Sequence, residues 1–327
     1  MTTTHPIKRR AIALGALAAT VVAGRARSQP AAYPNRPVRM LVPFPPAGSL
    51  DNVGRVVAQR LQERLGQPFV VENRAGAGGH IGAELVARAP ADGYTLLFAG
   101  TWLAIAPSLQ KLAYDAPRDL AGVSMLSLGS FVLVAQRAQP FSTFQAFLSA
   151  ARAQPGRLSY GSQGNGSGPH LSMAWLSELA GISLLHVPYK GSAQNVQAVL
   201  SGEVNVAFEP AITVLPHLRA GTLKALAVGS PTPLATLPDV PPVAAIYPGF
   251  DTDGWQALFA PAGTPADVRQ RLSAEIARVM AMPEVVSMLR NLGTEPLSSS
   301  PDQVDTMLRA QIASWGRIIR QNGIKAD

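Results

Sequence analysis

The chain contains no cysteine and few charged residues. Without Cys, its 327 residues cannot form a disulfide, a thiolate metal site or a lipid-modified N-terminal cysteine, so no lipid anchor is expected. Charged residues make up only 15% of the chain but hydrophobic residues reach 47%, which excludes disorder as its main state. A chain of this length can form two packed cores of ordinary domain size.

Much of the positive charge lies at the N-terminus. The formal net charge is +8, but residues 1–28 hold five basic residues and no acidic one, and the remainder carries +3. That remainder has no run of Lys and Arg and no basic stripe interleaved with aromatic residues. Nucleic acid is therefore not an expected partner.

Residues 1–28 have the three parts of an export signal. A basic segment ends at Arg10, an apolar stretch covers 11–24, and small residues follow at 26–28. The apolar stretch is shorter than the roughly 20 residues that a membrane span needs. Ile12 and Ala13 fit the twin-arginine pattern poorly, so the general secretory route is favoured and the other stays open. We expect a mature protein that is free outside the cytoplasm.

From Tyr33 onward, short apolar segments alternate with amphipathic ones, which is typical of βαβ units around parallel sheets. One series of strands is predicted at 38–44, 68–74, 94–98 and 123–128. A second series is predicted at 131–135, 158–162, 184–189, 204–208 and 223–228. A lone strand at 255–261 and three helices end the chain.

The two series predict an α/β fold with two lobes, each a mostly parallel sheet flanked by helices. We expect the lone strand to complete the first sheet, so that lobe 1 comprises 33–129 plus 252–327 and lobe 2 comprises 130–251. The chain then crosses between the lobes twice, near 128–131 and near 249–255. Such a double crossing is typical of a hinge.

Three glycine-rich loops lie between a predicted strand and a predicted helix, at 45–51, 75–80 and 162–168. Glycine lets backbone N–H groups turn toward a ligand, and each helix N-terminus carries about half a positive charge. Together they predict an anion site without a cationic side chain. A small carboxylate suits such a site better than a polyphosphate, which usually requires Lys, Arg or a metal.

Several polar residues near these loops have simpler structural interpretations. His80 and His170 stand in first helical turns and are expected to be structural, as is His186 inside a strand. Asp51 is expected to cap the first helix. Glu209 could receive an amine or hydroxyl of a ligand or cap a helix, and both interpretations stay open.

No enzyme constellation emerges from the sequence. The segment AGAGGHIG resembles a dinucleotide fingerprint, but Ile81 stands where the third glycine belongs. A P-loop, a G-x-S-x-G elbow and a His pair at metal spacing are all missing. We therefore expect no catalytic residue, no metal and no cofactor, and a dinucleotide-dependent enzyme is the least favoured alternative.

Segments in order along the whole mature chain resemble the Bug-type periplasmic receptors of the tripartite tricarboxylate transporter family, among them YPNRPVRMLVPFPPAGSLD, VVENRAGAGGHIG, SYGSQGNGSGPHLSMAWL and HVPYKGSAQNVQAVLSGEVNVAF. The resemblance implies a hinge-closing fold like that of type II periplasmic binding proteins. It also implies a small carboxylate held by backbone N–H groups and water, and delivery by a monomer to membrane permease subunits. A sensor that docks on a two-component histidine kinase has the same fold and stays an alternative.

The resemblance further implies which residues meet the ligand. From lobe 1 these are Phe44, Ala47, Gly48, Ser49, Gly76, Ala77, Gly78 and Thr101, and from lobe 2 they are Ser162, Gly164, Gly166 and Ser167, with Phe208 and Glu209 bordering the site.

Some positions depart from the family pattern. Ala47 stands where a glycine is usual, Leu50 where a small hydroxyl residue is frequent, and Trp102 is unusually large beside the expected cleft. These departures leave the identity of the ligand open but not the fold.

Overall fold

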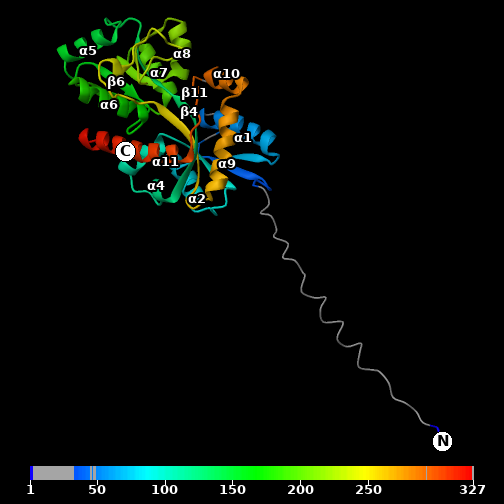
Figure 1. Ribbon diagram of the computed structural model, residues 1–327. Helices are drawn as coiled ribbons and strands as arrows, with labels where there is room; N and C mark the ends of the chain where they lie inside the picture. Colours follow the sequence, from blue (N-terminus) through cyan, green and yellow to red (C-terminus); the bar gives the residue numbers. More distant parts are fainter. Residues whose placement is uncertain (3–32, 45, 47–48, 292, 326–327) are drawn as a thin grey trace. The chain divides into compact units, whose positions relative to one another are not determined.

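The computed structural model describes residues 1–2, 33–44, 46, 49–291 and 293–325, so that nearly all of the predicted export signal lies outside the described residues. The chain divides into two units, 1–35 and 36–327. The fold below is that of the second unit (Figure 1). Within the described part of the chain, no helix is both long enough and apolar enough to cross a bilayer.

The first sheet of the described residues has six strands in the order β11-β4-β10-β3-β1-β2. Its strands are β1 (Val38–Val42), β2 (Phe69–Asn73), β3 (Thr95–Gly100), β4 (Leu120–Gly129), β10 (Gly254–Pro261) and β11 (Glu295–Pro296). Strand β10 lies between β3 and β4 and is antiparallel to both. The last long strand therefore returns to the first sheet, as the sequence predicts.

Amphipathic helices accompany this sheet. They are α1 (Ser49–Leu65), α2 (His80–Ala87), α9 (Ala266–Met280), α10 (Pro283–Asn291) and α11 (Pro301–Gln321), with the one-turn helices α3 (Trp102–Ile105) and α4 (Ala116–Asp119). Helix α1 buries Val53, Val57 and Leu61 on one face. It ends at Gly66, whose φ of +69° is left-handed.

The second sheet has five strands in the order β7-β6-β8-β5-β9. These are β5 (Phe131–Gln136), β6 (Ser159–Ser162), β7 (Leu185–Pro188), β8 (Val206–Pro210) and β9 (Leu223–Val228). The accompanying helices are α5 (Phe144–Ala153), α6 (Gly168–Ala180), α7 (Ser192–Ser201) and α8 (Ala211–Arg219). In α6, Leu171 and Trp175 are buried, whereas Leu179, at the same helical spacing, is 42% exposed.

Both sheets are mixed, whereas the sequence predicts mostly parallel ones. Parallel pairing is confined to the βαβ parts, where β1 pairs with β2 and β3, and β6 with β7 and β8. Strand β5 enters its sheet directly from β4, with only Ser130 between them, and is antiparallel to β8 and β9. A strand that arrives without a helical crossover is free to pair antiparallel.

The two connections between the sheets lie side by side. The amide of Gly229 donates to the carbonyl of Phe131 at 2.8 Å, and the amide of Thr252 donates to the carbonyl of Gly229 at 3.0 Å. A side chain at Gly229 would approach the Thr252 hydroxyl to 2.4 Å, so only glycine fits this close approach. The residues at which one lobe gives way to the other stay a prediction.

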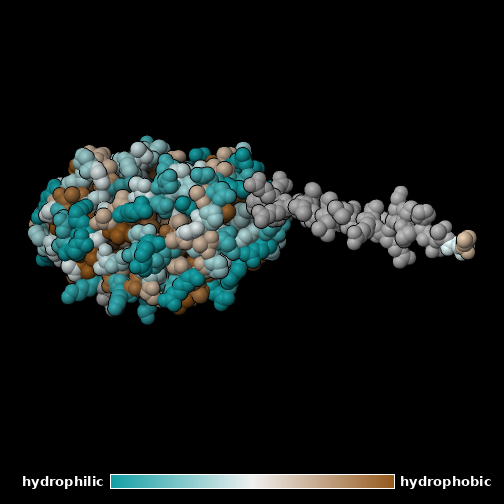
Figure 2. All heavy atoms as spheres, turned by 60° about the horizontal axis from the view of Figure 1, so that its bottom comes forward, coloured by the Kyte–Doolittle hydropathy of each residue, from teal (hydrophilic) through white to brown (hydrophobic). Residues whose placement is uncertain are grey.

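The face of the molecule drawn in Figure 2 has no dominant apolar patch. The face in Figure 2 is largely hydrophilic, and its hydrophobic residues form small separate areas. Ile81 and Leu85, on α2, are about half exposed, at 48% and 49%. Single exposed apolar residues of this kind are ordinary and mark no binding surface.

Candidate ligand-binding site

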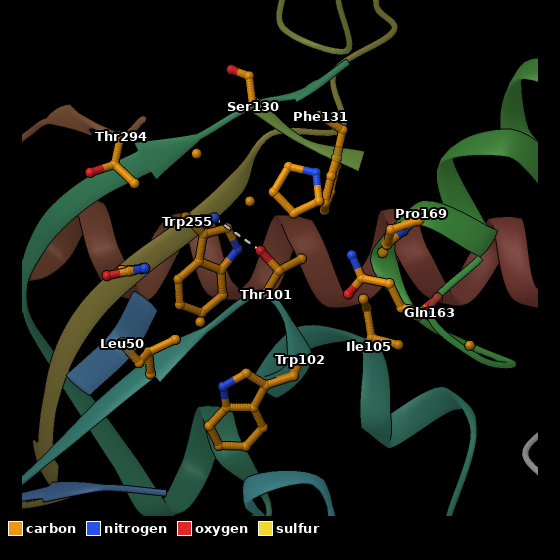
Figure 3. A pocket seen from close by; sticks show the side chains of 18 of the residues that line it. Leu50, Thr101, Trp102, Ile105, Ser130, Phe131, Gln163, Pro169, Trp255 and Thr294 are labelled. Atoms are coloured by element: carbon orange, nitrogen blue, oxygen red, sulfur yellow. Dashed lines mark hydrogen bonds between the residues drawn. The ribbon is translucent and has the colours of Figure 1, made fainter. Parts of the chain in front are cut away.

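A cavity of about 730 Å³ is lined by residues of both sheets (Figure 3). Its wall includes the carboxyl ends of β3, β4 and β8, at Gly100, Gly129 and Pro210, and the start of β5 at Phe131. Ligands of open α/β sheets bind at such strand ends. The cavity therefore lies where the topology predicts a ligand.

Several helices begin at the cavity wall, among them α1 with Leu50 and Asn52, α2 with His80, and the helices α6 and α8 of the second sheet. Ser167 caps α6, with its hydroxyl accepting from the amide of His170, and Ser167, Gly168 and Pro169 all line the cavity. The first turn of α8, through Thr213, lines it as well. The first amides of a helix have no partner within the helix, and the dipole adds partial positive charge there. In α8 the amide of Ala211 donates instead to the Ser130 carbonyl at 2.9 Å, and in α6 Pro169 has no N–H, so the remaining first-turn amides are those that can meet a ligand. This part of the wall is suited to an anion.

The first sheet contributes further hydrogen-bond donors. The Thr101 hydroxyl accepts from the backbone amide of Trp255 at 3.0 Å, and the hydroxyl hydrogen is then available to donate. The indole nitrogens of Trp102 and Trp255 are buried, and neither has a hydrogen-bond partner among the described residues. An indole N–H can only donate. The wall thus favours acceptors over donors in a ligand.

Ionised side chains are missing from the described cavity wall, which contains no Lys, Arg, Asp or Glu. Its one histidine, His80, has a pKa lowered by burial and is neutral at pH 7. The His80 Nδ1 lies 2.7 Å from the Tyr114 hydroxyl, and burial raises the pKa of that phenol well above its usual range. Attraction of an anion therefore rests on dipoles and neutral donors.

Comparison with known proteins matches this architecture to a family of receptors. Residues 53–324 match the tripartite tricarboxylate transporter family receptor, TctC. The chain belongs to this family. TctC proteins are binding proteins and not enzymes, so the expected absence of catalysis follows from the family.

Individual relatives agree with this family. The chain is 36% identical to Protein BugT of Bordetella pertussis, with 90% of this chain and 91% of BugT covered. It is similar to the structure of R. palustris Rpa4515 with adipate, at 32% identity and TM-score 0.77, over 90% of this chain and 100% of that one. The chain is also similar to the structure of MatC from Rhodopseudomonas palustris with bound malate, at 30% identity and TM-score 0.70, over 88% of this chain and 100% of that one. The resemblance found in the sequence is confirmed.

Three of the residues expected at the ligand of this TctC receptor line the cavity, namely Thr101, Gly166 and Ser167. Ala47 and Gly48 lie outside the described residues, and Ser49 is the first residue of α1. The remaining expected residues lie behind the wall or beside it.

The second glycine loop lies behind Trp102. Ala77, with a φ of +47°, precedes Gly78 and Gly79 at +62° and +100°. A side chain at Gly79 would approach the Trp102 ring to 3.2 Å and the Phe44 ring to 3.3 Å. Phe44 itself packs edge-on against Trp102, with 5.9 Å between ring centroids. The described wall does not include Phe44, Gly76, Ala77 or Gly78. Phe44 and Gly79 instead pack against Trp102, which does line the cavity.

The other residues expected at the ligand in lobe 2 form a second layer behind Gly166 and Ser167. The Ser162 hydroxyl is buried against His186 Nε2 at 2.7 Å, and Gly164 accepts from the same hydroxyl at 3.2 Å. Phe208 is fully buried and stacks on Phe250 at 6.2 Å between centroids. None of Ser162, Gly164 and Phe208 belongs to the described wall.

Glu209 is also fully buried, behind two cavity-lining residues. Its carboxylate accepts from Gln163 at 3.2 Å and from Thr213 at 3.4 Å, which both line the cavity, and from Asn195 at 2.7 Å and Ser192 on the other side. Burial raises the pKa of Glu209 to about 7. The Glu209 carboxylate thus holds these four neighbours in place, and the expected ligand contact or helix cap at Glu209 stays a prediction.

Sequence reasoning missed part of the wall. Ile105, Leu109, Gln163, Ile212 and Thr294 line the cavity, and so does His80, which was expected to be only structural. The segments after β3 and β8 lack the glycine signal. Their position after predicted strands was the available indication, because any loop at the carboxyl end of these strands faces the same edge.

Proposed function

We propose that this TctC receptor captures a small carboxylate between its two lobes and delivers it to a tripartite tricarboxylate-type permease. The observation that carries the proposal is the anion-suited wall, where α6 and α8 begin at a cavity whose described lining has no Lys, Arg, Asp or Glu. The relatives whose structures contain adipate and malate support a carboxylate as the ligand class.

Closure of the hinge provides the affinity. A ligand that bridges both walls binds the closed state more tightly than the open one and so shifts the equilibrium toward closure. Exclusion of water also strengthens hydrogen bonds from N–H groups to a carboxylate. Micromolar binding corresponds to about 8 kcal/mol, within reach of a few such bonds with buried contacts.

The adjacent connections at Gly229 and Ser130 support the hinge. We propose lobe 1 as 33–129 plus 252–327 and lobe 2 as 130–251, because β4 passes into β5 at Ser130 and the return passage pairs with it. The proposed site residues are those that line the cavity, Thr101, Gly166 and Ser167, with the second layer behind them.

The proposed compartment is the periplasm. The N-terminal sequence has the pattern of an export signal, and related structures are periplasmic transporters or binding proteins. Delivery to a permease requires a receptor that moves freely, which agrees with the proposed monomer without a lipid anchor.

Calorimetric titration of residues 29–327 with a panel of carboxylates tests the capture step. We expect at least one carboxylate to bind with measurable heat and to raise the melting temperature, and the corresponding uncharged amide to do neither. No response to any carboxylate of the panel would contradict the proposal. Uptake of the labelled ligand by cells with and without the gene then tests delivery.

A further inference from the structure

We infer that the imidazole of His80 donates a hydrogen bond from Nε2 to a carboxylate oxygen of the ligand, and that the Tyr114 hydroxyl holds the ring in the tautomer that can do so. This inference rests on the proposed function and adds a ligand contact at a histidine that was expected to be only structural. His80 is the first residue of α2 and lines the cavity from the side of the first sheet.

The His80 ring is fixed by its neighbours. The residue is only 9% exposed, and its ring packs edge-on against Trp102 with 5.2 Å between centroids. Its Nδ1 lies 2.7 Å from the Tyr114 hydroxyl, whereas Nε2 has no hydrogen-bond partner among the described residues. A polar group that is largely buried costs free energy unless it is paired. Nε2 is therefore the ring atom that a ligand can satisfy.

The edge of the ring that carries Nε2 faces the second glycine loop. A side chain at Gly78 would lie 3.9 Å from Cδ2 and 4.0 Å from Nε2 of His80, and apart from its chain neighbours it would meet no other described atom within 4 Å. Gly78 is one of the residues that the family resemblance places at the ligand. Nε2 thus borders space that a ligand atom can enter, between the cavity wall and this loop.

The Tyr114 hydroxyl determines which nitrogen of His80 carries the proton. Burial lowers the pKa of His80 from its ordinary 6.5, so the ring is neutral at pH 7.5 and has one N–H donor and one acceptor nitrogen. A phenol is a good donor and a poor acceptor, whereas an imidazole nitrogen is basic. Donation from Tyr114 to Nδ1 also uses the single hydroxyl hydrogen, for which the described residues offer no other acceptor. The proton of His80 therefore stands on Nε2.

This tautomer suits a carboxylate. A hydrogen bond to an ionised acceptor is about twice as strong as one between neutral groups, and Nε2–H provides one without a cation. In the other tautomer, the Nε2 lone pair would face the carboxylate oxygen and repel it. Tyr114 is itself buried and does not belong to the described cavity wall. It is therefore a positioning residue that acts through His80.

Nitrogen-15 NMR of residues 29–327, labelled at histidine, measures the tautomer at pH 7.5 without any ligand. We expect the His80 signals, assigned by their loss in His80→Gln, to show a protonated Nε2 and an unprotonated Nδ1. In Tyr114→Phe we expect a mixture of the two tautomers. A proton on Nδ1 in the wild type would overturn the inference.

Matched substitutions test the contact by calorimetry at pH 7.5, with whichever of adipate, malate and the other panel acids binds the wild type most tightly. Glutamine places its amide where Nε2 stands, whereas asparagine reaches only the position of Nδ1. We expect His80→Asn to weaken binding at least tenfold and His80→Gln less than threefold. Equal affinities of the two folded variants would overturn this inference but leave the proposed function intact. Failure of every acid to bind the wild type would overturn both.

A double-mutant cycle tests the positioning role and still decides if His80→Asn does not fold. Tyr114→Phe should weaken the same acid about three- to fivefold in the wild type and have no further effect in His80→Gln, whose amide has no tautomer to be set. His217→Asn, at a histidine outside the described cavity wall, is the control. Equal losses from Tyr114→Phe in both backgrounds would show that Tyr114 does not act through His80.

Discussion

At the scale of single residues, a neutral polar group lies at the surface of the cavity, and a carboxyl group is buried behind it. Thr101 keeps a neutral hydroxyl at the surface of the cavity, whereas Glu209 lies behind it with four hydrogen-bond donors around its carboxylate. A buried carboxylate costs free energy unless its oxygens are satisfied. The donors that Glu209 gathers include Gln163 and Thr213, so its burial orders the wall that a ligand meets.

The pKa of Glu209 leads to a prediction about stability. Its pKa rises from the ordinary 4.5 to about 7 on folding, so the folded state binds this proton more tightly than the unfolded state. The stabilisation is complete below about pH 4.5 and is lost as the pH rises through 7, by up to about 3 kcal/mol. Glu209→Gln removes the titration. Urea unfolding at pH 5 and pH 8 should show a smaller decrease in the variant than in the wild type.

A second buried carboxyl group, that of Asp253, also contributes to the pH dependence of stability. Burial raises its pKa to about 6, so it titrates in the same direction and leaves a residual slope in Glu209→Gln. Asp253→Asn should remove a different part of the slope, centred at lower pH. An unchanged slope in Glu209→Gln would mean that the carboxyl is not a buried acid.

Thr101 supplies a second prediction at this scale. Thr101→Val keeps the shape of the side chain but removes the hydroxyl that receives the Trp255 amide and faces the cavity. Loss of this donor to a charged ligand should weaken binding about tenfold. Thr101→Ser keeps the hydroxyl and is the matched control. Both variants are titrated with a carboxylate that binds the wild type. Equal affinities of Thr101→Val and Thr101→Ser for this carboxylate would exclude a ligand contact of the hydroxyl.

At the scale of elements, the start of α6 joins folding to binding. Ser167 caps the helix, Pro169 occupies its first turn, and Gly181 ends it in a left-handed conformation with a φ of +61°. Loss of a cap costs about 1 kcal/mol. The same first turn lines the cavity, so a change in charge at the cap acts on an anionic ligand directly.

Ser167→Asp separates the two roles. Aspartate caps as well as serine does, so the melting temperature in the absence of ligand should change little. Its negative charge lies at the same helix start as the proposed carboxylate and should weaken binding at least a hundredfold at pH 7.5. Ser167→Asn caps without the charge and is the control. Unchanged carboxylate affinity in the aspartate variant would place the anion elsewhere.

Elements of this kind are also what the sequence predicts best. The apolar segment at 223–228 and the glycine-rich loop at 162–168 before a helix are local signals, and the structure has β9 and α6 where they were expected. Strand direction is not local, because β5 takes its orientation from β4 in the other sheet. The glycines of the second loop signal left-handed backbone but not its purpose. A glycine that leaves room for a neighbouring side chain, as Gly79 does for Trp102, cannot be distinguished in the sequence from a glycine that leaves room for a ligand.

At the scale of the whole molecule, the two proposed lobes meet along the cavity, where Gly166 lies opposite Leu109 with no room for a side chain between them. A side chain at Gly166, in the loop before α6, would approach Leu109 Cδ1 to 2.3 Å. Leu109 follows β3, and Gly166 follows β6, so the contact joins segments of the two sheets. A side chain at position 166 would press against Leu109 and so oppose any closure that brings the two walls together.

Gly166→Ala should therefore act as a wedge between the lobes. Its φ of +72° adds backbone strain, and Gly156, at +73° with no neighbouring atom within 4 Å, offers the same strain without the contact. Both alanine variants should lose about 1 kcal/mol of stability. Only Gly166→Ala should weaken carboxylate binding and abolish the decrease in radius of gyration that solution scattering should detect when the wild type binds its ligand. Because the strain is matched, equal behaviour of the two variants would show that the lobes do not close against this contact.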